Sequence, residues 1–322
     1  MAEPSATVGQ RDQDEHFRQE VLEAFDAGLR DISTAVNKVD VLVSVKSFSL
    51  HFTKDAPRRE SSDSKEIQQQ LGALWSMFME TAKVLEEDNP FQEQLLSLLL
   101  WTKEFDSLHR SIHHTETVES AWELYPFGAR LQTIWEELLR SGTVAEQCNL
   151  AAFSAKALSV GLCREEISLT ALWYLREALE ANDEARTIAL LPVVRIWFDY
   201  CRHTLLAFSF ENHCYEDKSK LYLVAPGYLA QRANISQQGF SLKRWLFWKE
   251  RLKQLCHNRY TTAAIEAKKG FINMVNCGRE LEYDVPGEAV FAEKLQKVMA
   301  EVLSKSGKEP IHADGFDIDV DG

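Results

Sequence analysis

The chain has 322 residues, of which 49 are acidic and 36 are basic, and its formal net charge at pH 7 is −13. Apolar residues make up 45% and charged residues 26%, which is typical of a folded globular protein and excludes a largely disordered one. The negative charge repels polyphosphate, so we expect no nucleic acid as a partner unless one face is strongly basic.

The apolar segments are too short for a membrane span. The longest largely apolar runs, 95–101 and 188–194, fall well below the ~20 residues that cross a bilayer, so no membrane partner is expected. Residues 1–14 lack the basic and apolar regions of a signal peptide. The six cysteines are scattered without a CxxC pair, as expected of reduced thiols. We therefore expect a cytoplasmic protein, with the nucleus as the alternative, and no secretion.

The first part of the chain predicts two helical segments and a loop. After a polar arm over 1–13, apolar residues three and four apart predict a helix between 17 and 36. The segment 39–52 is rich in β-branched residues, but no similar strand lies near it, which favours a continuing helix. The polar segment 53–65 is expected to be a flexible loop.

Capping residues mark the next helix. An apolar stripe predicts a helix over 71–84, and Asn89 is expected to cap another that begins at Pro90. The Gln92 side chain is placed to reach back to this cap. Between 95 and 101 the second helix is apolar on nearly every side, which predicts a central position.

The middle of the chain repeats these signals. A helix over 122–139 is expected to end at Gly142, and Thr143 with Glu146 forms a capping box for the following helix. Gly161 is expected to end that helix.

Further helices follow in the second half. An apolar stripe predicts one over 167–179, and Pro192 is expected to start or kink a long one. Ser241 is expected to cap another helix, with Phe240 and Trp245 as the two ends of a hydrophobic staple.

The last helices precede a polar tail. Apolar residues from 264 to 281 and from 291 to 303 predict two helices. The tail over 304–322 is acidic and expected to be disordered; it begins like a calcium loop but lacks the closing glutamate.

Together these elements predict an all-α fold. We expect an irregular multi-helix bundle of about ten helices without a solenoid repeat. A single helical domain is expected over 14–303; in the alternative, 14–88 is a smaller lobe packed on 89–303.

Four features of the second half carry a resemblance. They are Leu175–Glu180 (LREALE), Leu191–Trp197 (LPVVRIW), the segment 239–252 with its RWLFWKER run, and Met274. In this order they resemble a fungal family of uncharacterised proteins, the domain of unknown function 3632, over about residues 90 to 303. The resemblance implies a helical, mostly intracellular protein, sometimes encoded near genes of secondary metabolism. It implies no catalytic residues.

One basic segment has two interpretations. Residues 243–253 hold five basic side chains, and Arg244 and Arg251 lie seven apart, on one face of a helix. In the first interpretation these two arginines clamp an anion, a phosphate or carboxylate, or a partner. In the second they flank the apolar stripe of a core helix and pair with acidic residues elsewhere. Amphipathic helices commonly carry this pattern, which favours the second interpretation. The stripe consists of Trp245, Trp248, Leu252 and Leu255.

The histidines and cysteines do not predict a metal site. Zinc prefers paired ligands on short turns, whereas the three Cys–His pairs are irregularly spaced, at 201/203, 213/214 and 256/257. His109 and His113 are four apart but lack the HExxH signature, which favours a polar helix end. We expect no bound metal.

A phosphorylation site is a further hypothesis. Arg58 and Arg59 precede Ser61 in the pattern of a basophilic kinase substrate within the expected loop. Short motifs of this kind also arise by chance.

No catalytic signature was found. The chain lacks GxSxG, GxGxxG, a Walker loop, DDxxD and the paired ExxH motifs of di-iron proteins. The sequence therefore favours a binding or accessory protein with a protein partner, without a cofactor. The alternative is a non-classical enzyme or accessory factor of fungal secondary metabolism, with an aromatic-lined pocket between helices.

Overall fold

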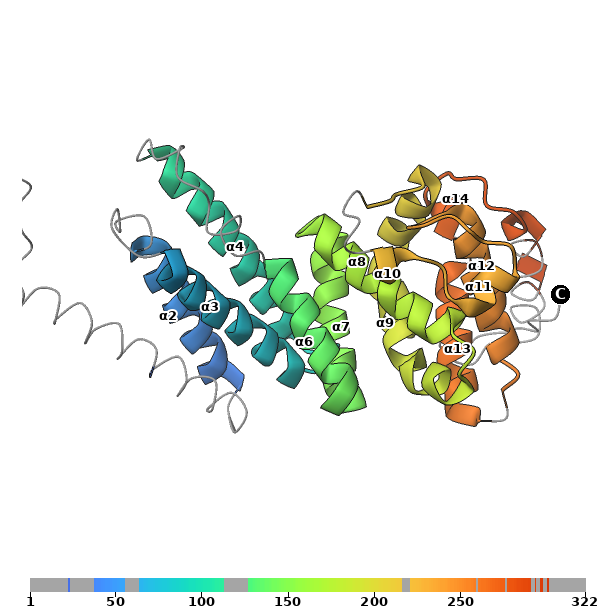
Figure 1. Cartoon of the computed structure of the whole chain (residues 1–322), viewed down its shortest axis with the longest axis horizontal. Coiled ribbons are helices and arrows are strands. Elements are labelled where there is room, and N and C mark those ends of the chain that lie inside the picture. Colours follow the sequence, from blue (N-terminus) through green and yellow to red (C-terminus); the bar gives the residue numbers. More distant parts are fainter. Residues whose placement is uncertain are drawn as a thin grey trace, which may run out of the picture. The chain divides into compact units, whose positions relative to one another are not determined.

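A computed structural model describes most of the chain. The described residues are 23, 38–55, 64–112, 127–215, 221–258, 260–275, 277–290, 293, 296, 297 and 300. All regular elements within these ranges are helices, so the predicted all-α fold is confirmed (Figure 1). None of these helices is both long and apolar enough to cross a membrane.

Several predictions fall outside these ranges. The arm over 1–13, the tail over 304–322, most of the helices expected over 17–36 and 291–303, and the first residues of the helix expected over 122–139 lie there. So does 56–63, the middle of the expected loop.

The chain forms two compact units, residues 1–157 and 158–322. The boundary falls within helix α7 (Val144–Ser159). Compactness does not establish independent folding, so the expected single domain over 14–303, and its alternative lobe boundary after residue 88, stay predictions.

Unit 1 is built around α3. Its other helices contact α3 or one another: α2 meets α3 and α4, and α3 meets α4 and α6. The Trp75 ring of α3 lies edge-on to the Phe127 ring of α6, with centroids 5.6 Å apart, and both side chains are buried. The bounds are α2 (Lys38–Asp55), α3 (Ser64–Val84), α4 (Pro90–Ile112) and α6 (Phe127–Ser141).

The segment 39–52 is helical, as the sequence favoured. It lies inside α2, which continues to Asp55, and α3 begins at Ser64. Both ends of the loop expected over 53–65 are therefore helical.

The start of α4 confirms one prediction and corrects another. The Phe91 amide donates to Asn89 Oδ1 at 3.0 Å, so Asn89 caps the helix. Gln92 does not reach back to the cap. Its buried amide donates to the carbonyl oxygens of Leu85 at 2.8 Å and Asn149 at 3.1 Å, and thereby ties α4 to the end of α3 and to α7.

The middle of α4 is central on one face only. Leu95 and Leu99 are buried, whereas Trp101 is 38% exposed and stacks on Phe105 with ring centroids 5.1 Å apart. The expected all-round burial is therefore wrong for Trp101.

The capping box before α7 is confirmed. The Thr143 amide donates to Glu146 Oε2 at 2.8 Å, and the Glu146 amide donates to Thr143 Oγ1 at 3.2 Å. The bonds from the Thr143 backbone and side chain hold the pKa of Glu146 below its usual value. At the other end, α7 stops at Ser159, before Gly161 with its φ of +79°.

Unit 2 is built around the long helix α9, which contacts α8, η2, α12, α13 and α14 (Figure 1). Pro192 lies inside α9 rather than at its start, and the non-helical backbone lies at Cys201, with φ −135° and ψ 21°. The bounds in this unit are α8 (Arg164–Leu175), η2 (Arg176–Glu180), α9 (Glu184–Glu211), α10 (Leu221–Val224), α11 (Tyr228–Arg232), α12 (Leu242–Leu255), α13 (Thr261–Met274) and α14 (Cys277–Glu280).

Two predictions for the end of unit 2 have different outcomes. Ser241 caps α12, because its Oγ accepts the Arg244 amide at 3.3 Å. The apolar stripe from 264 to 281 is divided between two helices, since α13 ends at Met274 and α14 begins at Cys277.

Candidate functional site

A π-helical turn brings a carboxylate into the core of unit 2. The helix that was expected to run on through 167–179 changes at Arg176 to the π-helix η2, which ends at Glu180. Such turns insert one residue and rotate the following side chains, and they are frequent at functional sites. The Glu180 side chain is completely buried. A buried carboxylate requires several hydrogen bonds or a cation to offset its lost hydration.

Arg244 supplies the cation. Its Nε donates to Glu180 Oε1 at 2.6 Å and its Nη2 to Glu180 Oε2 at 3.0 Å, with both side chains 0% exposed. The same guanidinium donates to the carbonyl oxygens of Val224 (2.9 Å), Gly239 (2.7 Å) and Ala225 (3.4 Å). These five bonds use all five N–H donors of the arginine.

Glu180 is equally saturated. Besides Arg244, its Oε1 accepts Trp248 Nε1 at 2.7 Å and its Oε2 accepts the Gly227 amide at 2.6 Å. Charge-assisted bonds of this kind are short and directional. The Glu180–Arg244 pair therefore fixes residues 224–227 and Gly239 to the core formed by η2 and α12.

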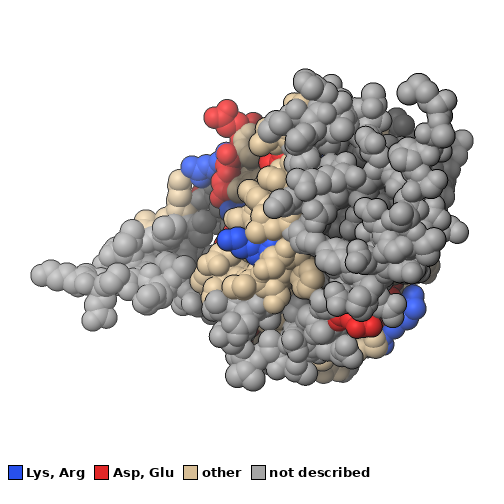
Figure 2. Space-filling model, turned by 90° about the vertical axis from the view of Figure 1, so that its left-hand side faces the viewer, with Lys and Arg blue, Asp and Glu red and all other residues tan. Residues whose placement is uncertain are grey.

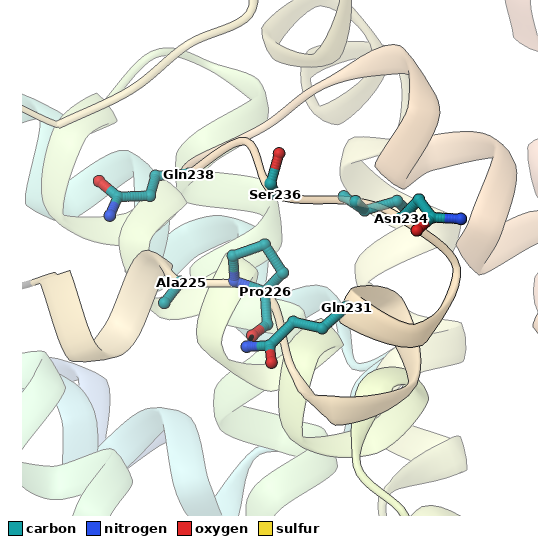
Figure 3. Close-up of a pocket in the computed structure, with 7 residues that line it drawn as sticks. Ala225, Pro226, Gln231, Asn234, Ser236 and Gln238 are labelled. Carbon is teal, nitrogen blue, oxygen red and sulfur yellow. Dashed lines mark hydrogen bonds between the residues drawn. The ribbon is translucent and has the colours of Figure 1, made fainter.

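The segment between these fixed points surrounds a pocket of about 510 Å³, the loop pocket. Figure 3 shows Gln231 extending toward Pro226, with Ser236 and Gln238 on the neighbouring stretch of the loop. The pocket is lined by Ala225, Pro226, Gln231, Asn234, Ile235, Ser236 and Gln238.

Hydrogen bonds to backbone carbonyl groups hold the edges of the loop pocket. The Gln231 amide nitrogen Nε2 donates to the Pro226 carbonyl at 2.7 Å. The Phe240 amide donates to the His213 carbonyl at 2.8 Å. Gly239 has a φ of +76°, and a Cβ on it would lie 2.3 Å from His213 O, so this close approach requires glycine.

The lining of the loop pocket is polar but not ionisable. Three residues with carboxamide side chains and one with a hydroxyl line it, and no His, Lys, Arg, Asp, Glu, Cys or Tyr is among the lining residues. Carboxamides both donate and accept hydrogen bonds, so this lining suits an uncharged polar ligand. It offers no group for general acid–base catalysis.

The two predicted arginines do not occupy equivalent places. Arg244 is buried and pairs with a carboxylate, as in the second interpretation, and it has no N–H left for an external anion. Arg251 is only partly buried, and its Nε has no hydrogen-bond partner. Burial lowers the pKa of Arg251, an effect that the nearby Glu184 opposes. The anion site formed by Arg244 and Arg251 therefore stays a prediction. The structure shows no position at which both guanidinium groups could hold the same anion.

The remaining sequence candidates give no site in the described residues. Ser61 lies outside them, as does the side chain of His109. Within the described part of the chain, no group of three or more His, Cys, Asp and Glu is arranged to hold a metal. His203 and His213 each lie beside a carboxylate instead, on Glu280 and Glu165 respectively.

Aromatic residues mainly fill the cores of the two units. Five of the seven tryptophans in the described residues are completely buried, and none of the residues that line the loop pocket is aromatic. The completely buried ones are Trp75, Trp135, Trp197, Trp245 and Trp248.

Surface charge is mixed where it can be seen. On the face shown in Figure 2, the described basic and acidic side chains lie among uncharged residues and gather into no patch of one sign.

Glu180 was missed by the sequence analysis. Its signal was a carboxylate directly after Ala178 and Leu179, at the end of the apolar stripe over 167–179. Its partner Arg244 was identified, but 64 residues separate the two, and no periodicity links positions so far apart.

Comparison with known proteins identifies a family. No curated protein and no solved structure matches the chain. The family model described as "Protein of unknown function (DUF3632)" matches residues 75–252, more than half of the chain. The match begins in α3, ends in α12 and includes Glu180, Arg244 and the whole loop pocket. The chain therefore belongs to the DUF3632 family.

Proposed function

We propose that the chain is a binding protein and that the loop pocket holds an uncharged stretch of a protein partner. One observation carries this proposal: a pocket lined by carboxamides and a hydroxyl is held in place by the buried Glu180–Arg244 pair. Peptide main chain presents one N–H donor and one C=O acceptor per residue, which complements such a lining.

The lining supports binding rather than catalysis. Ser236 is the one hydroxyl among the lining residues, and no base that could activate it is among them. The pocket also offers apolar contact through Pro226 and Ile235, both buried. A peptide segment fits this lining if its main-chain N–H and C=O groups bond to the polar residues and a small apolar side chain packs on Pro226 and Ile235.

The fixed backbone of the loop pocket supports its affinity for a ligand. Bonds from the Glu180–Arg244 pair hold both ends of the segment that forms the pocket, at Val224 to Gly227 and at Gly239. A preformed site loses less conformational entropy when a ligand binds.

The proposed location is the cytoplasm, with the nucleus as the alternative. All six cysteines are free thiols, which supports a reducing compartment. The partner is therefore sought among proteins of that compartment.

Photo-crosslinking tests this proposal. A benzophenone amino acid replaces Gln238 in the full chain within its native cells, and crosslinked peptides are identified by mass spectrometry. Replacement of Gln254, an exposed glutamine on α12 outside the pocket lining, is the matched control. We expect one peptide sequence to be captured at Gln238 and not at Gln254.

The captured peptide is then synthesised and titrated by fluorescence anisotropy. We expect Gln238→Arg to weaken its binding by at least about tenfold, or about 1.4 kcal/mol, and Gln254→Arg to leave it unchanged. Equal capture at both positions, or equal affinity in both variants, would contradict the proposal.

A further inference from the structure

A second pocket of about 340 Å³ lies in unit 2, between α12, α13 and the segment that follows α14. We name it the α12–α13 pocket. Its volume falls at the lower end of the roughly 300–1,000 Å³ range of small-molecule sites. It is lined by Leu246, Lys249, Glu250, Lys253, Phe271, Val275, Pro286, Gly287, Glu288 and Val290.

Glu288 brings an unsatisfied acceptor to this pocket. Its side chain belongs to a residue that is only 5% exposed, and its Oε2 accepts the Arg279 amide at 3.2 Å. Its Oε1 is buried and accepts no hydrogen bond from the described residues. Burial raises the pKa of Glu288, and the opposite charge of Lys249 and the backbone amides of Arg279 and Gly278 act against this rise.

The position of Glu288 is built into the backbone. A Cβ on Gly278 would lie 2.8 Å from Glu288 Oε2 and 2.3 Å from the Val285 side chain. The absence of a side chain at Gly278 therefore makes room for the carboxylate. The site is thus formed by the fold and not by a chance surface rotamer.

Lys249 brings a cation to the same pocket. The residue is partly buried on α12 and makes no hydrogen bond or ion pair with the described residues. Burial lowers the pKa of Lys249, whereas the charges of Glu288 and Glu250 act to raise it. Lys249 and Glu288 therefore attract each other across the pocket without forming a direct ion pair.

Most of the remaining lining residues are apolar, and two, Glu250 and Lys253, are charged. Phe271 comes from the last turn of α13, Val275 follows directly after that helix, and Leu246 comes from α12. The pocket thus combines a partly desolvated lysine, a buried carboxylate, an apolar surface and two further charged side chains, the mixture of polar and apolar groups expected of a small-molecule site.

We propose that the α12–α13 pocket binds an α-amino acid with an apolar side chain. The ligand ammonium donates to Glu288 Oε1, the ligand carboxylate accepts from Lys249, and the apolar side chain packs on Phe271 and Val275. A zwitterion satisfies both unpaired groups at once. A simple carboxylate leaves Glu288 Oε1 without a donor, and a simple amine leaves Lys249 without an acceptor.

The first experiment compares ligands on the unmodified full chain by isothermal titration calorimetry. The probes are L-phenylalanine, L-leucine, 3-phenylpropanoate, which lacks the ammonium group, and phenethylamine, which lacks the carboxylate. We expect L-phenylalanine or L-leucine to bind, and each truncated analogue to bind at least about tenfold more weakly than L-phenylalanine. Failure of both amino acids to bind at concentrations up to about 10 mM would overturn the proposal.

The second experiment assigns each ligand group to its protein partner. Lys249→Met is expected to abolish the preference for L-phenylalanine over phenethylamine and to keep the preference over 3-phenylpropanoate. Glu288→Gln is expected to abolish the preference for L-phenylalanine over 3-phenylpropanoate and to keep the preference over phenethylamine, because each variant removes the partner of one ligand group. Lys243→Met and Asp284→Asn change exposed residues outside the lining and should preserve both preferences. Unchanged preferences in Lys249→Met and Glu288→Gln would overturn the assignment. Circular dichroism establishes that each variant is folded, and the ligand comparison above decides the proposal without any variant.

Discussion

Glu180 and Arg244 form a completely buried, bidentate ion pair, with Arg244 Nε 2.6 Å from Glu180 Oε1 and Nη2 3.0 Å from Oε2. Two helical elements far apart in the sequence, η2 and α12, are joined by this pair. The loop between α10 and α12 is joined to it through backbone groups. The pair therefore connects the core of unit 2 to the loop pocket.

Removal of either charge is expected to destabilise the protein strongly. Arg244→Met leaves the Glu180 carboxylate buried without its cation and removes the guanidinium donor from three carbonyl groups. The expected loss is about 3–5 kcal/mol in the free energy of unfolding, measured by urea denaturation. Arg251→Met, on the same helix but without a bond at Nε, is the control and is expected to cost less than about 1 kcal/mol. Equal losses in the two variants would show that the pair is not stabilising.

Removal of both partners tests the coupling. The double variant Glu180→Met, Arg244→Met buries no uncompensated charge, so its loss of unfolding free energy should be smaller than the sum of the single losses. The same urea titrations give this coupling energy, and strict additivity would contradict the observed bidentate contact.

Gly227 is expected to tolerate no side chain. Its Cβ would lie 2.7 Å from Glu180 Cβ and 3.0 Å from Glu180 O, although its φ of −74° suits alanine. Gly227→Ala should therefore cost about 1–3 kcal/mol of stability and distort the loop pocket. Gly270→Ala is the control, because the nearest atom, Leu252 Cδ1, is 3.4 Å away and alanine favours the interior of α13. Thermal unfolding should show a lower Tm for Gly227→Ala and a Tm at or above wild type for Gly270→Ala.

The capping box gives a pH-dependent contribution to stability. Thr143→Ala removes the hydroxyl from the start of α7 and is expected to cost about 1 kcal/mol near neutral pH. The pKa of Glu146 is lowered in the folded state, chiefly by the Thr143 backbone N–H, so its stabilisation is present above its unfolded pKa. It is lost as the pH falls through the folded pKa. The free energies of unfolding of wild type and Glu146→Gln, measured by urea titration, should therefore converge at acid pH. A difference that does not change with pH would show that the Glu146 carboxylate is not the source of the pH dependence.

The two unpaired charges of the α12–α13 pocket are expected to lower stability. The pKa of Glu288 is raised by burial, so its cost is absent below the unfolded pKa and develops as the pH rises through the folded pKa. Glu288→Gln should match wild type in acid and exceed it in unfolding free energy at neutral pH. The pKa of Lys249 is lowered by burial, so its cost is present at neutral pH and fades in alkali. Lys249→Met should thus be more stable than wild type at neutral pH, with a gap that closes as the pH rises.

A gain of stability with a loss of amino-acid binding is the pattern of a functional site. Urea titrations without ligand give the stability of each variant, and calorimetry gives its affinity for the amino acid. A loss of stability in both variants at neutral pH would mean that Lys249 and Glu288 are paired in solution.

Local signals predicted the helix starts well. Asn89, Thr143 and Ser241 each cap the helix that the sequence assigned to them, because a cap depends on residues within one turn. Gln92 was placed in the same kind of local contact, but it bonds to Leu85 and Asn149, because the carbonyl groups of these two residues lie beside it in the folded unit.

The sequence by itself determined that this protein is helical, where several of its helices begin, and that Arg244 lies on a helix with an apolar stripe. These properties follow from contacts between residues close in the chain, which periodicity and capping motifs report. Tertiary structure alone decided that Arg244 meets Glu180, that the loop pocket lies beside this pair, and that Lys249 and Glu288 line one pocket. Those pairings depend on which helices pack together and on a π-helical turn that rotates Glu180 into the core, and neither leaves a periodic signal in the sequence.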